Sequence, residues 1–416
     1  MRFYRFCITA FITIICMNWL ARSVVPSSDQ LENIRAYTRQ DEFDFTSWTL
    51  DAAWTKFSQG ISGEESALSP AAAHDLVITY LSQVYGYQVV TQTLEQIYSD
   101  PAIHDPTAAS AELRSEQHQL SADIKQSAPA AEAVLQDQIT SVLYNQGLSS
   151  LGNPLPPVLF HFSPLPFALI ISPRNIIRQD AYISLQTDLS ITDRVALERA
   201  VETGQGVSAL VEEIGGIGTY PTMVQQGSDL NWLVEVIAHE WIHNYLEWHP
   251  LGLGYDSSPE MRTMNETAAS IAGKEISALV IARYYPELVP PAVDTAPARI
   301  EPNSLPPEPA FDFRAEMRDT RVKVDQLLAA GKVTEAETYM EERRQFFWQN
   351  GYQIRRLNQA YFAFHGAYAD TPGGAAGADP VGPAVRELRR KSPTLAAFIH
   401  QIAALSSFEE LQQLLH

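Results

Sequence analysis

Three residues near the middle of the chain combine types and spacing that suit metal chemistry. His239, Glu240 and His243 stand in the segment VIAHEWIH (residues 236–243), which contains the pattern HExxH. Four residues make about one turn of an α-helix, so both imidazoles would share one face and reach one ion. Glu240 would lie about 100° around the helix from His239, close enough to touch a water on that ion. The pattern predicts a metal site with a base beside it.

The residues around this motif are apolar on almost every side. They predict a buried helix over Leu230–Trp248. Two imidazoles and a carboxylate inside such a helix cost several kcal/mol unless each polar group finds a partner. A bound cation would be that partner. The alternative is a pair of core histidines satisfied by a buried ion pair without any metal.

Two residues compete to be the third ligand. His249 follows His243 by six positions, as in the pattern HExxHxxGxxH, but Leu246 replaces the glycine that lets the chain leave the helix. On an uninterrupted helix His249 would point about 120° away from His243. Glu266 lies on the next predicted helix, Pro259–Tyr285, after a glycine-containing loop that turns the chain back. We therefore expect Glu266 as the ligand.

The expected set of His239, His243 and Glu266 leaves one position open to water. Such a set is typical of catalytic Zn²⁺, whereas structural zinc has four protein ligands. Only two cysteines occur, Cys7 and Cys16, so thiolates are not ligands in the body of the chain.

This arrangement resembles a known group of enzymes. HExxH followed on a second helix by Asn265-Glu266 resembles the gluzincins, the zinc metallopeptidases that include thermolysin and aminopeptidase N. The segments NETAA (265–269) and LNQAY (357–361) are similar to a bacterial family described as zinc aminopeptidases. The resemblance covers residues 150–416. It implies a zincin-like catalytic domain that hydrolyses peptide bonds in peptide or protein substrates. Aminopeptidase activity is one form of hydrolysis that the resemblance implies.

The resemblance also implies roles for individual residues. Glu240 would take a proton from the attacking water and pass it to the leaving amine. Thermolysin-like enzymes support one histidine ligand with an aspartate four positions after the glutamate ligand. Ser270 stands there in this chain, so another partner is needed, and Glu235, one turn before His239, is one substitute.

Gluzincins stabilise the oxyanion with a tyrosine or histidine, which in this chain would have to come from outside the metal helices. Tyr361, His365 and Tyr368 would share one face of a predicted helix at i, i+4 and i+7, and are our candidates. Aromatic packing at a helix interface explains them equally well. An aminopeptidase also needs a carboxylate for the substrate amine, which Glu212 or Glu213 could provide. Solvated glutamates at a strand end are the more ordinary explanation of that pair.

The elements that must position these residues predict an α+β fold with a central catalytic core. Residues 24–152 read as helices and residues 153–286 as the zincin-like core. Strands of one sheet are expected at 157–162, 167–172 and 181–185, then a helix at 191–202. Residues 207–224 contain Gly215, Gly216 and Gly218 and predict an edge strand with a tight turn. The two metal-binding helices follow.

Proline density predicts a linker over residues 287–310 and separates the core from a helical C-terminal subdomain, 311–416. Helices are expected there at 313–330, 333–369 and 382–416, with a loop near 371–377. The chain carries 29 basic and 49 acidic residues, a formal charge of −20. This charge has the wrong sign for binding phosphate backbones, so nucleic acid is not an expected partner.

Residues 1–23 have the layout of a signal peptide or signal anchor. Arg2 and Arg5 precede an apolar run over 6–21. The body is therefore expected to be extracytoplasmic, either secreted or held on a membrane by this segment. The alternative to an enzyme is a non-catalytic, membrane-associated binding or scaffold protein that keeps a zincin fold. A zinc-stabilised structural module would need a fourth protein ligand, for which His249 is the candidate.

Overall fold

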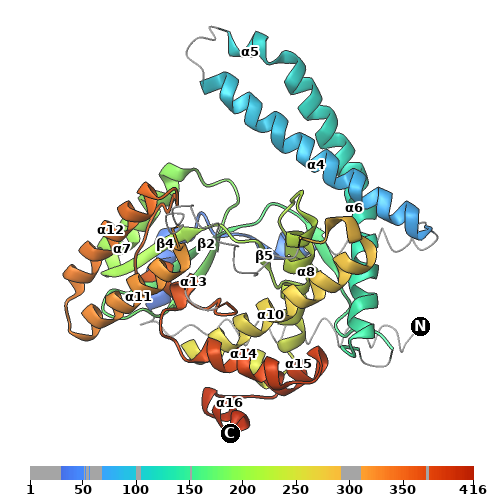
Figure 1. Ribbon diagram of the computed structural model, residues 1–416. Coiled ribbons are helices and arrows are strands. Elements are labelled where there is room, and N and C mark those ends of the chain that lie inside the picture. The colour runs from blue at the N-terminus through green and yellow to red at the C-terminus, as the bar shows by residue number, and fades with distance from the viewer. Residues whose placement is uncertain are drawn as a thin grey trace, which may run out of the picture.

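The structure is a computed structural model that describes residues 30–50, 52, 56, 68–99, 105–149, 152–291, 311–371 and 374–416 (Figure 1). Helices predominate and two small sheets accompany them, which confirms the expected α+β class. The predicted signal segment, 1–23, and most of the predicted linker, 287–310, lie outside the described residues. No helix within the described residues is long and apolar enough to cross a membrane.

A long helical hairpin forms most of the described N-terminal region. After α2 (Gln30–Thr38), helices α4 (Pro70–Ser99) and α6 (Ala111–Asn145) run antiparallel, with the short α5 (Pro106–Ala109) at the tip. The hairpin tip projects away from the rest of the molecule (Figure 1). The C-terminal half of α6 is instead buried in the main core, where Ile139 and Leu143 join one cluster with residues of the central helices.

The strands form two three-stranded sheets. In the first, β2 (Phe167–Pro173) pairs antiparallel with β3 (Ala181–Leu185) on one side and β4 (Val207–Glu212) on the other. In the second, β6 (Thr222–Val224) pairs parallel with β1 (Phe160–Phe162) and antiparallel with β5 (Gly216–Ile217). The prediction of a single sheet was wrong for residues 160–162. Such a short apolar run has no pattern that selects a partner strand, and packing against α6 decides its place.

Both faces of the first sheet are covered. Leu169 and Ile171 of β2 pack with residues of α2 and α7 (Ile191–Gln205). Ala168 and Ile170 point to the opposite face, where they contact α13 (Gln359–His365). This burial on both sides explains why the sequence of β2 is apolar without alternation. Helix α13 thus links the sheet to the helices that lie beyond it (Figure 1).

The two helices expected to bind metal lie side by side. They are α8 (Leu230–Leu246) and α10 (Pro259–Tyr284), joined through the short α9 (Pro250–Leu253). Their bounds differ from the predicted ones by two residues or fewer. Gly273 makes the close approach possible, because a Cβ there would lie 3.0 Å from the Glu235 carbonyl oxygen and 3.2 Å from the His239 amide nitrogen. The helix backbones therefore meet at the level of His239.

The C-terminal region contains more helices than the sequence predicted. The expected helix 333–369 is α12 (Val333–Gln349) followed, after Gly351 with φ of 88°, by α13. The expected helix 382–416 is divided into α14 (Val381–Lys391), α15 (Leu395–Ala403) and α16 (Phe408–Leu415). The side chains of Thr394 and Ser407 cap α15 and α16 and compete with helix continuation. Helix α11 (Phe313–Ala329) follows the predicted bounds closely.

Candidate metal centre

His239 and His243 of α8 meet Glu266 of α10 in one cluster. The two Nε2 atoms are 2.9 Å apart, and each lies 3.4 Å from Glu266 Oε2. A point about 1.9 Å from all three atoms exists at the centre of this triangle, slightly less than ordinary zinc–nitrogen and zinc–oxygen distances of about 2.0–2.2 Å. An ion just out of the triangle's plane would thus reach all three residues.

The state of the ligand atoms also fits a cation. Glu266 Oε2 is buried and accepts no hydrogen bond from any residue the structure describes. The amide oxygen of Asn265 lies 2.8 Å from His243 Nδ1 and accepts a hydrogen bond from it, so that in the neutral imidazole the lone pair of Nε2 is directed at the gap. A divalent cation would interact favourably with all three converging atoms at once.

His239 has a different partner from the one suggested by the sequence. Its Nδ1 faces the hydroxyl oxygen of Ser270 at 3.5 Å, a long contact. Ser270 occupies the position where thermolysin-like enzymes have aspartate, so the same position is used with a shorter, uncharged side chain. Glu235 was the suggested substitute. Burial raises the pKa of the Glu235 carboxyl group, and the charges of Lys274, Asp370 and His239 act on it, but no hydrogen bond joins Glu235 to His239 in the described structure.

Glu240 lies beside the cluster without belonging to it. Its side chain is buried, and burial raises its pKa while the neighbouring histidines oppose the rise. Gly216 of β5 covers it so closely that a Cβ there would be 2.8 Å from both Glu240 Cγ and Oε1. At a second glycine, Gly218, an added Cβ would lie 3.5 Å from Glu240 Oε2. The glycines that predicted a tight turn thus allow the strand to pass over this carboxylate.

The charges of the cluster act strongly on one another. Burial lowers the pKa of His243, but the Glu266 carboxylate more than offsets this and raises it to about 9. Burial raises the pKa of Glu266, but His243 and His239 together hold it well below its usual range. Without a bound ion, the site therefore retains a proton on His243 at neutral pH and keeps Glu266 ionised.

Two tyrosines near the cluster were missed by the sequence reasoning. Tyr255, in the loop before α10, donates a hydrogen bond of 2.5 Å from its hydroxyl group to Glu266 Oε1. Tyr182 of β3 is 40% exposed, yet partial burial raises its pKa, and the charges of Glu240 and Glu266 add to the rise. Neither residue belongs to a motif or a periodic pattern. Only the return of the chain after α9 and the placement of the sheet bring them to the site.

The three predicted oxyanion donors are separated in the structure. Tyr368 lies beyond the end of α13, so its predicted place on one helix face with Tyr361 and His365 was wrong. Its ring stacks beside His239 with centroids 6.1 Å apart. Tyr361 and His365 contact each other, with centroids 4.3 Å apart, and Phe364 lies between His365 and Tyr368. Of the three, Tyr368 is the one in contact with a candidate ligand.

Tyr361 and His365 line a separate cavity of about 470 Å³ together with Glu212 and Glu213. His365 Nε2 lies 3.9 Å from Glu212 Oε1. Burial lowers the pKa of His365 to about 4 and raises that of Glu212 to about 7. Glu213 is mostly exposed and lies 3.4 Å from Arg194. Of the two glutamates considered for binding a substrate amine, Glu212 is therefore the partly enclosed one.

His249 is placed away from the cluster. It precedes α9, and its Nδ1 donates to the carbonyl oxygen of Tyr245 at 2.9 Å while the two rings stack. Leu246 stands where the pattern HExxHxxGxxH has glycine, and, as expected, α8 continues to that residue. Glu266 alone supplies the third ligand atom in the described cluster.

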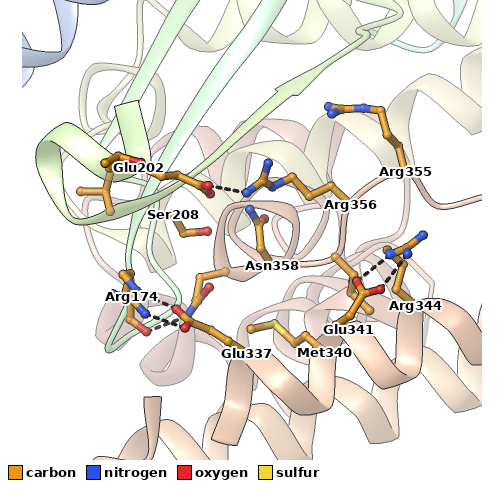
Figure 2. Close-up of a pocket in the computed structure, with 14 residues that line it drawn as sticks. Arg174, Glu202, Ser208, Glu337, Met340, Glu341, Arg344, Arg355, Arg356 and Asn358 are labelled. Carbon is orange, nitrogen blue, oxygen red and sulfur yellow. Dashed lines mark hydrogen bonds and ion pairs between the residues drawn. The ribbon is translucent and has the colours of Figure 1, made fainter. Parts of the chain in front are cut away.

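A cavity of about 520 Å³ lies elsewhere, where α12 and the segment before α13 approach β4 and α7 (Figure 2). Charged side chains line it, but they pair with one another. Arg174 pairs with Glu337, Arg344 with Glu341 and Arg356 with Glu202, as the dashed lines in Figure 2 show. Because these guanidinium groups already have carboxylate partners, this cavity gives no comparable indication of a ligand.

Comparison with known proteins adds no relative: no protein-family model, no curated protein and no solved structure matches this chain. The resemblance to gluzincins therefore depends on the residues of the metal centre and its neighbours alone.

Proposed function

We propose that the protein is a zinc-dependent peptidase whose zincin-like core, residues 153–286, binds Zn²⁺ through His239, His243 and Glu266. One observation carries the proposal: three ligand atoms converge, and Glu266 Oε2 is buried there without a hydrogen-bond donor. A zinc ion bound in such a site makes water more acidic and polarises a carbonyl group.

The remaining chemistry belongs to side chains of this chain. Glu240 accepts the proton of the attacking water and delivers it to the leaving amine, and its burial-raised pKa suits both steps. Tyr368, beside His239, donates a hydrogen bond to the oxyanion that develops on the scissile carbonyl. Asn265 and Tyr255 hold His243 and Glu266 in their orientations.

The substrate is a peptide or protein, and aminopeptidase activity is one form of this proposal. The carboxylate of Glu212, enclosed with His365 and Tyr361, has the chemistry to bind an N-terminal ammonium group. From the charge and apolar pattern of residues 1–23, we also propose that the protein is extracytoplasmic, either secreted or held on a membrane by that segment.

The decisive test compares the zinc-loaded wild type with Glu240→Gln. We expect about one zinc per chain in both proteins, cleavage of a mixed peptide library by the wild type, and loss of turnover by about 10²- to 10⁴-fold in the variant. Zinc binding without cleavage of any peptide would favour the scaffold alternative. Near-normal turnover by Glu240→Gln would refute the role of this residue.

A further inference from the structure

Arg262 is a buried guanidinium close to the metal centre. It lies on α10 four residues before Glu266, so both side chains leave the same helix face about 6 Å apart along the axis. Only 9% of Arg262 is exposed. Its Nη2 donates to the carbonyl oxygen of Ala363 at 2.7 Å, whereas its Nε is buried and has no hydrogen-bond partner.

This cation has no anionic partner in the part of the chain that the structure describes. Arg355, unlike Arg262, has an anionic partner: it is more exposed and binds the carboxylate of Glu198 through two nitrogens. Buried charges in proteins are normally paired, because burying an unpaired charge is energetically costly. The Ala363 carbonyl engages one of the five N–H donors of the guanidinium group and carries no full charge. A carboxylate has the planar shape and the negative charge that would pair with the Arg262 guanidinium group.

The charge of Arg262 acts on the residues that surround the metal ligands. Burial raises the pKa of both Tyr255 and Tyr368 well above the usual range, and the positive charge of Arg262 opposes the rise in both. Tyr255 hydrogen-bonds Glu266, and Tyr368 stacks on His239. The charge of Arg262 thus acts on two residues that contact candidate metal ligands.

We propose that Arg262 binds a carboxylate of the substrate, namely the free C-terminal carboxylate of a short peptide. The inference rests on the proposed peptidase function. A guanidinium group binds a carboxylate through two parallel hydrogen bonds, which fixes its orientation as well as its charge. Arg262 and Glu266 lie one helical turn apart on the same face of α10, which places the proposed carboxylate site beside the metal centre. The substrate class is therefore short peptides with a free C-terminal carboxylate.

The test uses the zinc-loaded full-length protein and three short peptides. They are a peptide with a free C-terminal acid, its C-terminal amide, and an amide whose last residue is glutamate. Dissociation constants are measured with Glu240→Gln, and kcat/KM with the wild type. We expect the acid to bind about 10- to 100-fold more tightly than the plain amide, as for charge-assisted hydrogen bonds. A glutamate amide that binds as tightly as the acid would support the carboxylate site but assign it to acidic side chains.

Arginine variants then separate ligand binding from a structural role. In the Glu240→Gln background, Arg262→Gln should bring the acid-to-amide ratio close to one, and Arg262→Lys should keep part of it because the charge remains. Arg283→Gln is the matched control, since Arg283 is on the same helix and exposed, and it should keep the full ratio.

Two results would count against separate claims. If the wild type cleaves peptides but treats acid and amide alike, or if Arg262→Gln lowers the melting temperature while the ratio persists, the carboxylate role of Arg262 is overturned. If the zinc-loaded wild type cleaves none of the peptides in this set or in a mixed library, the proposed peptidase function is overturned instead.

Discussion

The hydroxyl group of Tyr255 donates a hydrogen bond of 2.5 Å to Oε1 of Glu266, the carboxylate oxygen that does not face the histidines. Oε2 is thereby left to point between the two imidazoles. One carboxylate oxygen thus holds the orientation of Glu266, and the other faces the proposed metal site. Because the side chains of α10 and of the preceding loop are buried here, the carboxylate cannot rotate without breaking this bond.

Replacing Tyr255 by phenylalanine should therefore weaken zinc binding. Removal of a group that orients a ligand typically costs about 10- to 100-fold in metal affinity, and we expect Tyr255→Phe to fall in this range. Competition with a chromophoric chelator measures the affinity. Tyr144→Phe, on an exposed site of α6, is the control and should match the wild type. An unchanged affinity in Tyr255→Phe would show that packing alone holds Glu266.

Alanine at Gly273 should disturb the metal centre through the backbone. Its Cβ would press on the Glu235 carbonyl and the His239 amide and force α8 and α10 apart. We expect a loss of roughly 1–3 kcal/mol in the free energy of unfolding and weaker zinc binding. Gly86→Ala is the matched helical control, because its Cβ would meet only Leu120 methyl groups at ordinary contact distance. That variant should gain about 0.5–1 kcal/mol. Denaturant unfolding of both variants decides the matter.

Alanine at Gly216 should affect catalysis more than metal binding. The added Cβ would collide with the Glu240 side chain and with Val236, while no metal ligand is among its nearest contacts. Displacement of a general base by about 1 Å can cost 10²-fold in rate. We expect kcat to fall to that extent while zinc content stays near one per chain. Equal losses of zinc and turnover would indicate a general disruption of α8.

Zinc binding should depend on pH with a definite sign. In the metal-free protein the pKa of His243 is about 9, whereas the metal requires its unprotonated form. Between pH 6.5 and 8.5, zinc must therefore displace about one proton, and the apparent affinity should rise about tenfold per pH unit. Chelator competition at a series of pH values measures the slope. A flat profile would mean that His243 is already neutral in the metal-free protein.

The same shift predicts the stability of the metal-free protein. Because the folded-state pKa of His243 exceeds its unfolded value of 6.5, the stabilisation is fully present below pH 6.5 and is lost as pH rises through about 9. The contribution of His243 should accordingly make the metal-free protein melt at a lower temperature at pH 9.5 than at pH 6.5. His243→Gln, measured without metal, should show a smaller difference between these two pH values.

The sequence alone determined the features that depend on helix geometry. The spacing of His239 and His243 places them one turn apart, and the bounds of α8 and α10 follow from local capping and apolar patterns. The choice of Glu266 over His249 also came from local reasoning, since helix periodicity fixes the direction of a side chain. These properties arise from interactions between residues close together in the chain.

Only the tertiary structure decided which distant residues join the site. The hydrogen bond from Tyr255, the contact of Tyr368 with His239, the burial of Arg262 and the second sheet containing β1 each depend on how separate elements pack. Periodicity shows that a face is buried but not what covers it, because many partners could bury the same apolar area. The prediction that Tyr368 shares a helix face with Tyr361 was wrong because α13 ends at His365. The chain turns there and packs against α10, which the local sequence pattern does not show.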